Sequence, residues 1–178
     1  NNTFYSERTP AQTTRGLVDI HANTDGGLYA ISTGTKVFNN IFYTRNRVFN
    51  IKIHESACLE GFESDYNLFW CEAGEPVFEV DGQTKTFIQW QALGYDQHSV
   101  VLNPGFDSFT EFAPLNRLNY GTNLGEAYET GLTTDAIWSK TDPKTINQNV
   151  IWQVGARIFE RLPEGSKITI YPNPATGL

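Results

Sequence analysis

Residues 67–70 read Asn-Leu-Phe-Trp, and the same pattern occurs earlier as Asn-Ile-Phe-Tyr at 40–43 and as Asn-Thr-Phe-Tyr at 2–5. A second set of similar segments lies between them: Val-Asp-Ile-His at 18–21, Ile-Lys-Ile-His at 51–54 and Phe-Glu-Val-Asp at 78–81. Both sets recur after 27 residues at the later interval, and after 38 and 33 residues at the earlier one. A repeat of this length indicates stacked coils, with an insertion in the earlier coil.

Apolar and polar residues alternate along these segments, which is the pattern of a strand with one buried face. In residues 48–54, for example, Phe49, Ile51 and Ile53 alternate with a second set made up of Val48, Asn50, Lys52 and His54. Short strands, polar turns and a repeat of this length predict an all-β fold of the parallel β-helix type. Coils stacked about 4.8 Å apart would bury a continuous column of apolar side chains.

Asn2, Asn40 and Asn67 stand at equivalent places, each directly before an apolar strand. We expect the three side chains to stack at one turn, where each amide bonds its neighbour and satisfies backbone groups of the turn. This predicts a structural ladder of asparagines along one corner of the stack. The alternative is that a four-residue pattern recurs by chance.

The composition limits the possible partners. Over 178 residues, 13 Lys and Arg stand against 20 Asp and Glu, which gives a net charge of −7. Nucleic acids and anionic membrane surfaces both require basic clusters, so we expect neither as a partner. No apolar run approaches the roughly 18 residues of a membrane span, so we expect no membrane insertion. The chain holds no Met, and we expect a processed product or a fragment of a longer protein.

Beyond residue 82 the sequence no longer shows the repeat. Residues 86–94 predict a short helix with Thr86 as its N-cap and Gly94 as its stop. A strand is expected over 98–102, and a last apolar strand over 150–156 would cap the open end of the stack.

The register of the second set of segments puts two columns of ionisable side chains on one outward face. The first column is Asp19, Lys52 and Glu79. The second column is His21, His54 and Asp81. Opposite charges at stacked positions would stabilise the fold by about 0.2–1 kcal/mol per pair. The apolar residues between the columns, Ile20, Ile53 and Val80, are expected to point inward.

Two kinds of chemistry suit this face. In a polysaccharide lyase, Lys52 and His54 would be the candidate catalytic bases that remove the proton beside a uronate carboxylate. In a hydrolase, two carboxylates about 5–10 Å apart would act as acid and base. In the structural alternative the charges form only a solvated face. The candidate substrate-binding residues are Asp19, His21, Glu79, Asp81 and Trp138.

Other polar and aromatic residues suggest weaker sites. Trp138, in a polar loop, is a candidate platform for stacking sugars, and its alternative role is packing in the core or cap. Residues 25–27, Asp-Gly-Gly, allow a Ca²⁺ ligand or simply a turn, and no other metal or cofactor is expected. His98 is expected to bond its neighbours in a turn. Cys58 and Cys71 match no metal spacing, and a disulfide and two buried free thiols both remain open.

Residues 64–70, Ser-Asp-Tyr-Asn-Leu-Phe-Trp, resemble the late coils of secreted bacterial right-handed parallel β-helix proteins of the pectate-lyase-like superfamily. The resemblance spans about residues 36–110 and includes the expected helix and the Asn-Pro-Gly-Phe of 103–106. Residues 116–118, Asn-Arg-Leu, depart from the usual turn, so the cap is expected to differ. The resemblance implies a right-handed β-helix, here its late coils and C-terminal cap. It also implies a protein that acts on polysaccharide as a lyase or hydrolase, or alternatively a non-catalytic adhesin or glycan-binding stalk.

Residues 168–177 resemble the start of the C-terminal sorting domain of type 9 secretion cargo in Bacteroidetes. The matching residues are Tyr171, Pro172, Asn173, Pro174 and Gly177. The alternative is a Pro-rich strand end that breaks regular structure. The resemblance implies that the type 9 machinery exports the protein, which is then released or attached to the outer cell surface. We therefore divide the chain into coils and cap over 1–160, a linker over 161–167 and a sorting segment over 168–178.

Overall fold

The computed structural model describes residues 1–22, 30–125, 152–157 and 159. Its strands and helices follow one another along the chain as β1 (Thr3–Ser6), β2 (Val18–Ile20), β3 (Lys36–Phe38), β4 (Ile41–Thr44), β5 (Phe49–Ile53), the 3₁₀ helix η2 (Ser56–Leu59), β6 (Glu63–Asp65), β7 (Leu68–Cys71), β8 (Val77–Val80), β9 (Gln83–Thr86), α1 (Phe87–Gln91) and β10 (Val100–Val101).

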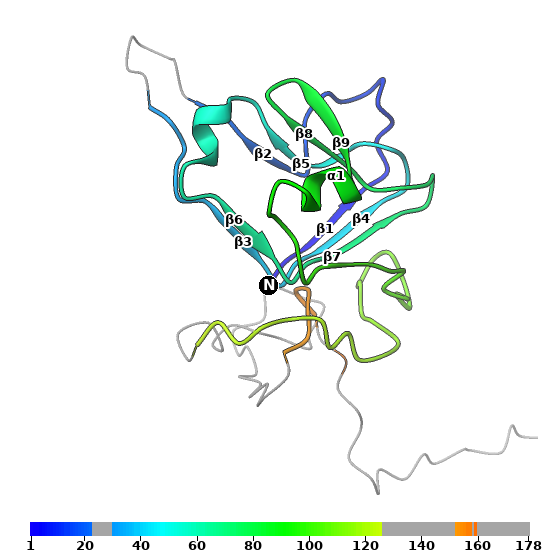
Figure 1. Cartoon of the computed structure of the whole chain (residues 1–178). Helices are drawn as coiled ribbons and strands as arrows, with labels where there is room; N and C mark the ends of the chain where they lie inside the picture. The colour runs from blue at the N-terminus through cyan, green and yellow to red at the C-terminus, as the bar shows by residue number, and fades with distance from the viewer. Residues whose placement is uncertain (23–29, 126–151, 158, 160–178) are drawn as a thin grey trace, which may run out of the picture.

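The strands form three sheets that surround one interior (Figure 1). Their orders are β1-β4-β7-β10, β2-β5-β8-β9 and β3-β6. Strands that are neighbours in a sheet come from successive repeats, so Phe4 pairs with Phe42, and Phe42 pairs with Phe69. Asn39 and Tyr66 have left-handed φ angles of 58° and 54° and turn the chain from β3 into β4 and from β6 into β7. Asparagine tolerates this conformation better than most residues.

Aromatic side chains fill the interior. The rings of Phe4, Phe42 and Phe69 stack in a column, with centroids 4.8 and 4.9 Å apart. At one end of the column α1 lies across the space between the sheets (Figure 1), and its fully buried Trp90 stacks on Phe78 at 4.9 Å. The predicted N-cap is confirmed, because Thr86 and Gln89 form a reciprocal capping box.

The expected fold class, a single all-β right-handed parallel β-helix, is wrong. The structure is mixed α/β, with few helices and with separate sheets of four, four and two strands. One of the four-stranded sheets is mixed, because β9 pairs with β8 in antiparallel fashion.

A tight reversal explains this departure from a uniform parallel stack. Asp81 and Gly82 follow β8 with φ angles of 50° and 73°. Two consecutive left-handed residues, and the Asp-Gly sequence itself, are typical of a two-residue hairpin turn. The chain therefore folds back along β8 as β9 and then enters α1, instead of adding another parallel strand to the second sheet.

Described residues after β10 pack against the outer side of the first sheet. Ile41, Leu68, Leu118 and Val154 form a second, smaller apolar cluster there. Trp152 makes only an isolated bridge to Gly121, so in the described part of residues 150–156 there is no regular strand. Similarly, β10 covers only two residues of the strand expected over 98–102.

The two cysteines, Cys58 and Cys71, are both buried and both free thiols. Of the two alternatives left open by the sequence, a disulfide and two buried free thiols, the second is therefore the one found. Burial raises the pKa of Cys58. In the part of the chain that the structure describes, none of the helices has the length and hydropathy needed to cross a membrane.

Candidate functional site

The first predicted column, Asp19, Lys52 and Glu79, is formed by strand pairing. Asp19 pairs with Lys52, and Lys52 pairs with Glu79. Lys52 and Glu79 are each only 9% exposed, and Lys52 Nζ lies 2.8 Å from Glu79 Oε1. Gly16 lies against Lys52, because a Cβ built on Gly16 would come within 2.9 Å of Lys52 Cβ. The expectation that these charges form a solvated face is therefore wrong for this pair.

Asp19 is the centre of a second polar group on the same sheet. Its carboxylate accepts hydrogen bonds from the Arg15 guanidinium at 2.7 Å and from the Gly16 backbone N–H at 3.0 Å. Asp19 Oδ1 also lies 3.1 Å from His54 Nε2. Burial acts to raise the pKa of Asp19, but the hydrogen bonds from Arg15, Gly16 and His54 outweigh it, so that the pKa is lowered.

The second predicted column is less regular. The rings of His21 and His54 meet edge to face with centroids 5.7 Å apart, and His21 Nδ1 contacts the Ala22 carbonyl at 3.1 Å. Asp81 is exposed and belongs to the hairpin turn after β8. The turn gives Asp81 a left-handed backbone, so it is not a third rung of a regular strand column.

This charged face does not offer a free general base of the expected kind. The Lys52 ammonium is held by Glu79 in a nearly dry environment, and one nitrogen of His54 is held by Asp19. A base must reach a substrate proton in its unprotonated form. The arrangement is therefore better suited to stabilising the sheet than to removing a proton.

The structure places Asn2, Asn40 and Asn67 in a hydrogen-bonded ladder. The backbone N–H and the side-chain amide of Asn2 both donate to Asn40 Oδ1, at 2.9 and 3.1 Å. The same two groups of Asn40 donate to Asn67 Oδ1, at 2.9 and 3.0 Å. Asn40 and Asn67 are buried, so the ladder satisfies backbone groups at the corner between two sheets.

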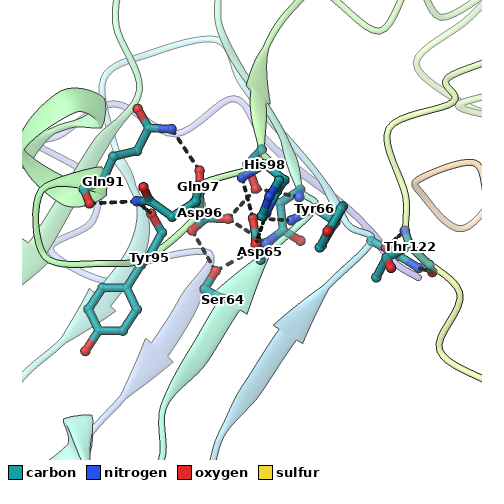
Figure 2. A network of polar contacts seen from close by, with 12 residues as sticks. Ser64, Asp65, Tyr66, Gln91, Tyr95, Asp96, Gln97, His98 and Thr122 are labelled. Carbon is teal, nitrogen blue, oxygen red and sulfur yellow. Dashed lines mark hydrogen bonds and ion pairs between the residues drawn. The ribbon is translucent and has the colours of Figure 1, made fainter.

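Asp96 terminates this ladder and lies at the centre of the network in Figure 2. The fully buried Asp96 carboxylate accepts four hydrogen bonds, from Ser64 Oγ, Asn67 Nδ2, Trp90 Nε1 and Ser99 Oγ, at 2.6–2.9 Å. Burial raises the pKa of Asp96, although all four hydrogen bonds act to lower it. The network joins α1 to the ladder and is inaccessible to a ligand.

Beside this network, three side chains lie together at the corner between β6 and β7 (Figure 2): Asp65 and Tyr66 are half-buried, and His98 is exposed. Asp65 accepts the His98 backbone N–H at 2.7 Å, and its other oxygen lies 2.7 Å from His98 Nδ1. The His98 ring stacks on Tyr66 with centroids 4.8 Å apart and an interplanar angle of 6°. The His98 side chain is 62% exposed.

Asp65 selects one tautomer of the neutral His98 imidazole. A carboxylate only accepts hydrogen bonds, so His98 Nδ1 carries the proton and Nε2 remains available as an acceptor in the neutral ring. Tyr66 and His98 thus form a flat, preorganised pair of rings with polar groups at their edges. We call Asp65, Tyr66 and His98 the corner site.

Sequence reasoning placed His98 in a turn but did not find its partners. Asp65 lies 33 residues earlier, in another repeat. The pairing of β10 with β7 joins Val100 to Leu68, so the position equivalent to His98 is Tyr66, and the stacked rings of these two residues follow from that register.

Several predicted features lie outside the described residues. These are the Asp-Gly-Gly of 25–27, Trp138, the linker over 161–167 and the sorting residues Tyr171, Pro172, Asn173, Pro174 and Gly177. Within residues 1–22, 30–125, 152–157 and 159, no group of three or more His, Cys, Asp or Glu is arranged to hold a metal ion. In comparisons with protein-family models, with curated proteins and with solved structures, no match to this chain was found.

Proposed function

We propose that this protein binds a neutral polysaccharide or surface glycan without cleaving it, and that the corner site is its binding platform. The observation that supports this proposal most directly is the exposed His98 ring, which stacks nearly parallel on the half-buried Tyr66. The faces of aromatic rings carry partial negative charge, which attracts the slightly positive C–H groups on the flat side of a sugar.

Polar groups at the same place would orient the sugar. In the neutral ring His98 Nε2 can accept a hydrogen bond from a hydroxyl group, and Asp65 holds His98 in position through its backbone N–H and its ring Nδ1. A ring that is already fixed loses little conformational freedom on binding, so more of the contact energy appears as affinity. The net charge of −7 repels uronate polymers and therefore favours neutral glycans.

The non-catalytic interpretation is supported by the ion-pair contacts of the two expected bases, Lys52 and His54. Lys52 Nζ is paired with Glu79, and His54 Nε2 contacts Asp19. We therefore propose binding in place of lyase or hydrolase chemistry on this face. A protein of this kind would act as an adhesin or as a glycan-binding module.

The test is a titration calorimetry panel of neutral and uronate oligosaccharides with wild type and three variants. In His98→Ala and Tyr66→Asn we expect binding of the neutral ligand to weaken at least about tenfold, which corresponds to about 1.4 kcal/mol. Asparagine is chosen because it tolerates the left-handed φ of Tyr66. Ile88→Ala is the matched control, since Ile88 is 71% exposed on α1 and should leave binding unchanged.

Equal affinity in wild type, His98→Ala and Tyr66→Asn would contradict the corner site. The same samples are assayed for new reducing ends and for unsaturated products. Product formation that disappears in His54→Ala would replace the binding proposal with an enzymatic one, because His54 contacts Asp19 on the charged face and is not part of the corner site.

We also propose export to the cell surface through the type 9 machinery, on the resemblance of residues 168–177 alone. Deleting residues 171–177 from the protein in a Bacteroidetes host should leave it inside the outer membrane, as measured by surface proteolysis of whole cells. Unchanged surface exposure after the deletion would contradict this proposal.

A further inference from the structure

The two oxygens of the Asp65 carboxylate have different partners. Oδ1 accepts two backbone N–H groups, from Tyr66 at 2.9 Å and from His98 at 2.7 Å. Oδ2 lies 2.7 Å from His98 Nδ1. The two backbone contacts fix the orientation of the carboxylate, so one defined oxygen is directed at the His98 ring.

This arrangement confines any change of protonation to the other nitrogen of the ring. Because Asp65 Oδ2 only accepts, His98 Nδ1 keeps its proton whether the ring is neutral or charged. Nε2 contacts no polar group in the part of the chain that the structure describes, and the side chain is exposed. Nε2 is therefore a bare acceptor in the neutral imidazole and an N–H donor in the imidazolium.

The surroundings of the His98 ring are suited to a positive charge. Asp65 Oδ2 forms an ion pair with the protonated ring, and Tyr66 presents the face of its ring, with the centroids 4.8 Å apart. The faces of aromatic rings attract cations. Imidazole is also the side chain that ordinarily changes charge between about pH 5 and pH 8.

The other charged groups beside the corner site are already occupied. Glu63, the second carboxylate of β6, forms an ion pair with Lys36. Asp96, two residues before His98, is fully buried and directs its carboxylate into the interior, where it accepts four hydrogen bonds (Figure 2). Among the described residues, Asp65 is therefore the charged group that contacts the His98 ring.

The protonation state of His98 decides which sugar groups Nε2 accommodates. A hydroxyl group both donates and accepts hydrogen bonds, so it fits Nε2 in either state. A uronate carboxylate only accepts, so it meets a lone pair on the neutral ring and the negative charge of Asp65 beside it. In the charged ring the carboxylate receives a charge-assisted hydrogen bond from Nε2–H, and the Asp65–His98 pair has lost its net negative charge.

We propose that His98 selects the ligand class of the corner site by its protonation state. The site binds neutral glycans in both states, and below about pH 6 it also binds uronate glycans through Nε2–H. Asp65 is the positioning residue, because it holds the proton on Nδ1 and leaves Nε2 as the group that changes. This inference rests on the proposed function of the corner site as a glycan platform.

The test is titration calorimetry at about pH 8 and about pH 5. Each neutral oligosaccharide of the panel above that binds is compared with its uronate counterpart of equal length, whose carboxylates stay ionised at about pH 5. From the higher to the lower pH we expect the affinity for the uronate ligand to rise at least about tenfold, and that for the neutral ligand to change by less than about twofold.

Three variants isolate the contribution of each group. In Asp65→Asn the amide oxygen keeps the two backbone N–H groups, so the NH₂ group replaces Oδ2 and donates to Nδ1. Nε2 then carries the proton in the neutral ring, and uronate affinity at about pH 8 should already be about tenfold above wild type. His98→Gln should lose the pH response. His54→Gln, the matched control on the charged face, should keep it.

The tautomer itself is read from long-range ¹H–¹⁵N NMR spectra at about pH 8. We expect the proton of the His98 ring on Nδ1 in wild type and on Nε2 in Asp65→Asn. The same tautomer in both proteins would overturn the inference. A uronate affinity that does not rise in acid, while the neutral ligand binds, would overturn it too and would leave the proposed function standing. Failure of all neutral ligands to bind at either pH would overturn the proposed function, and this inference with it.

Discussion

Asn67 donates its side-chain amide to Asp96 Oδ1 over 2.9 Å, so the row of asparagines ends on a buried carboxylate. Asn2 donates to Asn40, and Asn40 donates to Asn67. All of these donors point in one direction along the row, and hydrogen bonds in such a chain polarise one another. The row therefore contributes to offsetting the cost of burying Asp96.

The ladder predicts a graded loss of stability in three single substitutions. Asn67→Ala should lower the free energy of unfolding by about 3 kcal/mol. The substitution leaves the buried donors of Asn40 without their acceptor and removes a donor from the buried carboxylate of Asp96. Asn40→Ala should cost about 1–2 kcal/mol, and the exposed Asn2→Ala under about 0.5 kcal/mol. Urea unfolding at a constant m value measures the differences. Three equal effects would contradict the ladder.

The Trp90–Asp96 hydrogen bond can be isolated by comparing two tryptophans. Trp90 and Trp152 are both fully buried, but Trp90 Nε1 donates to Asp96 at 2.6 Å, whereas Trp152 Nε1 has no hydrogen-bond partner among the described residues. Trp90→Phe should therefore destabilise the protein by about 1–3 kcal/mol more than Trp152→Phe. Thermal and urea unfolding of both variants test this, and equal losses would count against it.

The buried Lys52–Glu79 pair should behave as a structural unit. Lys52→Met leaves Glu79 buried without its partner and should cost about 3–5 kcal/mol. The double variant Lys52→Met, Glu79→Leu removes both charges and should recover most of that loss. If the double variant is no more stable than the single one, the pair is not the source of the effect.

Asp19 should make stability depend on pH in the acid range. Its pKa in the folded protein is lowered from the usual 3.8, so its stabilising contribution is present above that value and is lost as the pH falls through the lowered pKa. The stability difference between wild type and Asp19→Asn should therefore be largest above about pH 4 and should shrink below it. Urea unfolding between about pH 2 and pH 6 would show this, and a constant difference would contradict it.

Tyr5 and Tyr43 should lose their phenolic protons at a higher pH than an ordinary tyrosine does. Burial, followed by hydrogen bonds to Glu7 and Glu72 respectively, raises the pKa of each tyrosine to about 12. The neutral phenols are favoured in the fold, so this contribution to stability is present below pH 10 and is lost as the pH rises towards 12. Glu72→Gln should lower the pKa of Tyr43, as measured by ultraviolet titration. A titration curve identical to that of wild type would contradict the assignment.

The repeat in the sequence was sufficient to pair the strands. Asn2, Asn40 and Asn67 occupy equivalent corners because each precedes an apolar strand, and the pairing of Asp19, Lys52 and Glu79 follows from the same spacing. The end of parallel pairing in the second sheet, at Asp81, was missed. That residue completes an apparent strand pattern, but it also begins an Asp-Gly turn, and the local turn geometry prevails over the pattern.

Burial and distant contacts were harder to predict. Alternation distinguishes the inner from the outer side of a strand, but it does not show that Gly16 lies against the outer side at Lys52. The contact of His98 with Asp65 joins two repeats, and the contact of Trp90 with Asp96 depends on how α1 docks. Both require tertiary packing that no local pattern encodes.

The reversal at Asp81–Gly82 has a consequence for association between molecules. Beyond β8 the second sheet presents β9, a polar strand of opposite direction with Lys85 within it. A chain that joined the sheet at this end would meet the wrong polarity for the parallel pattern and a charge to bury. Association of molecules edge to edge is therefore disfavoured at the β9 edge of this sheet.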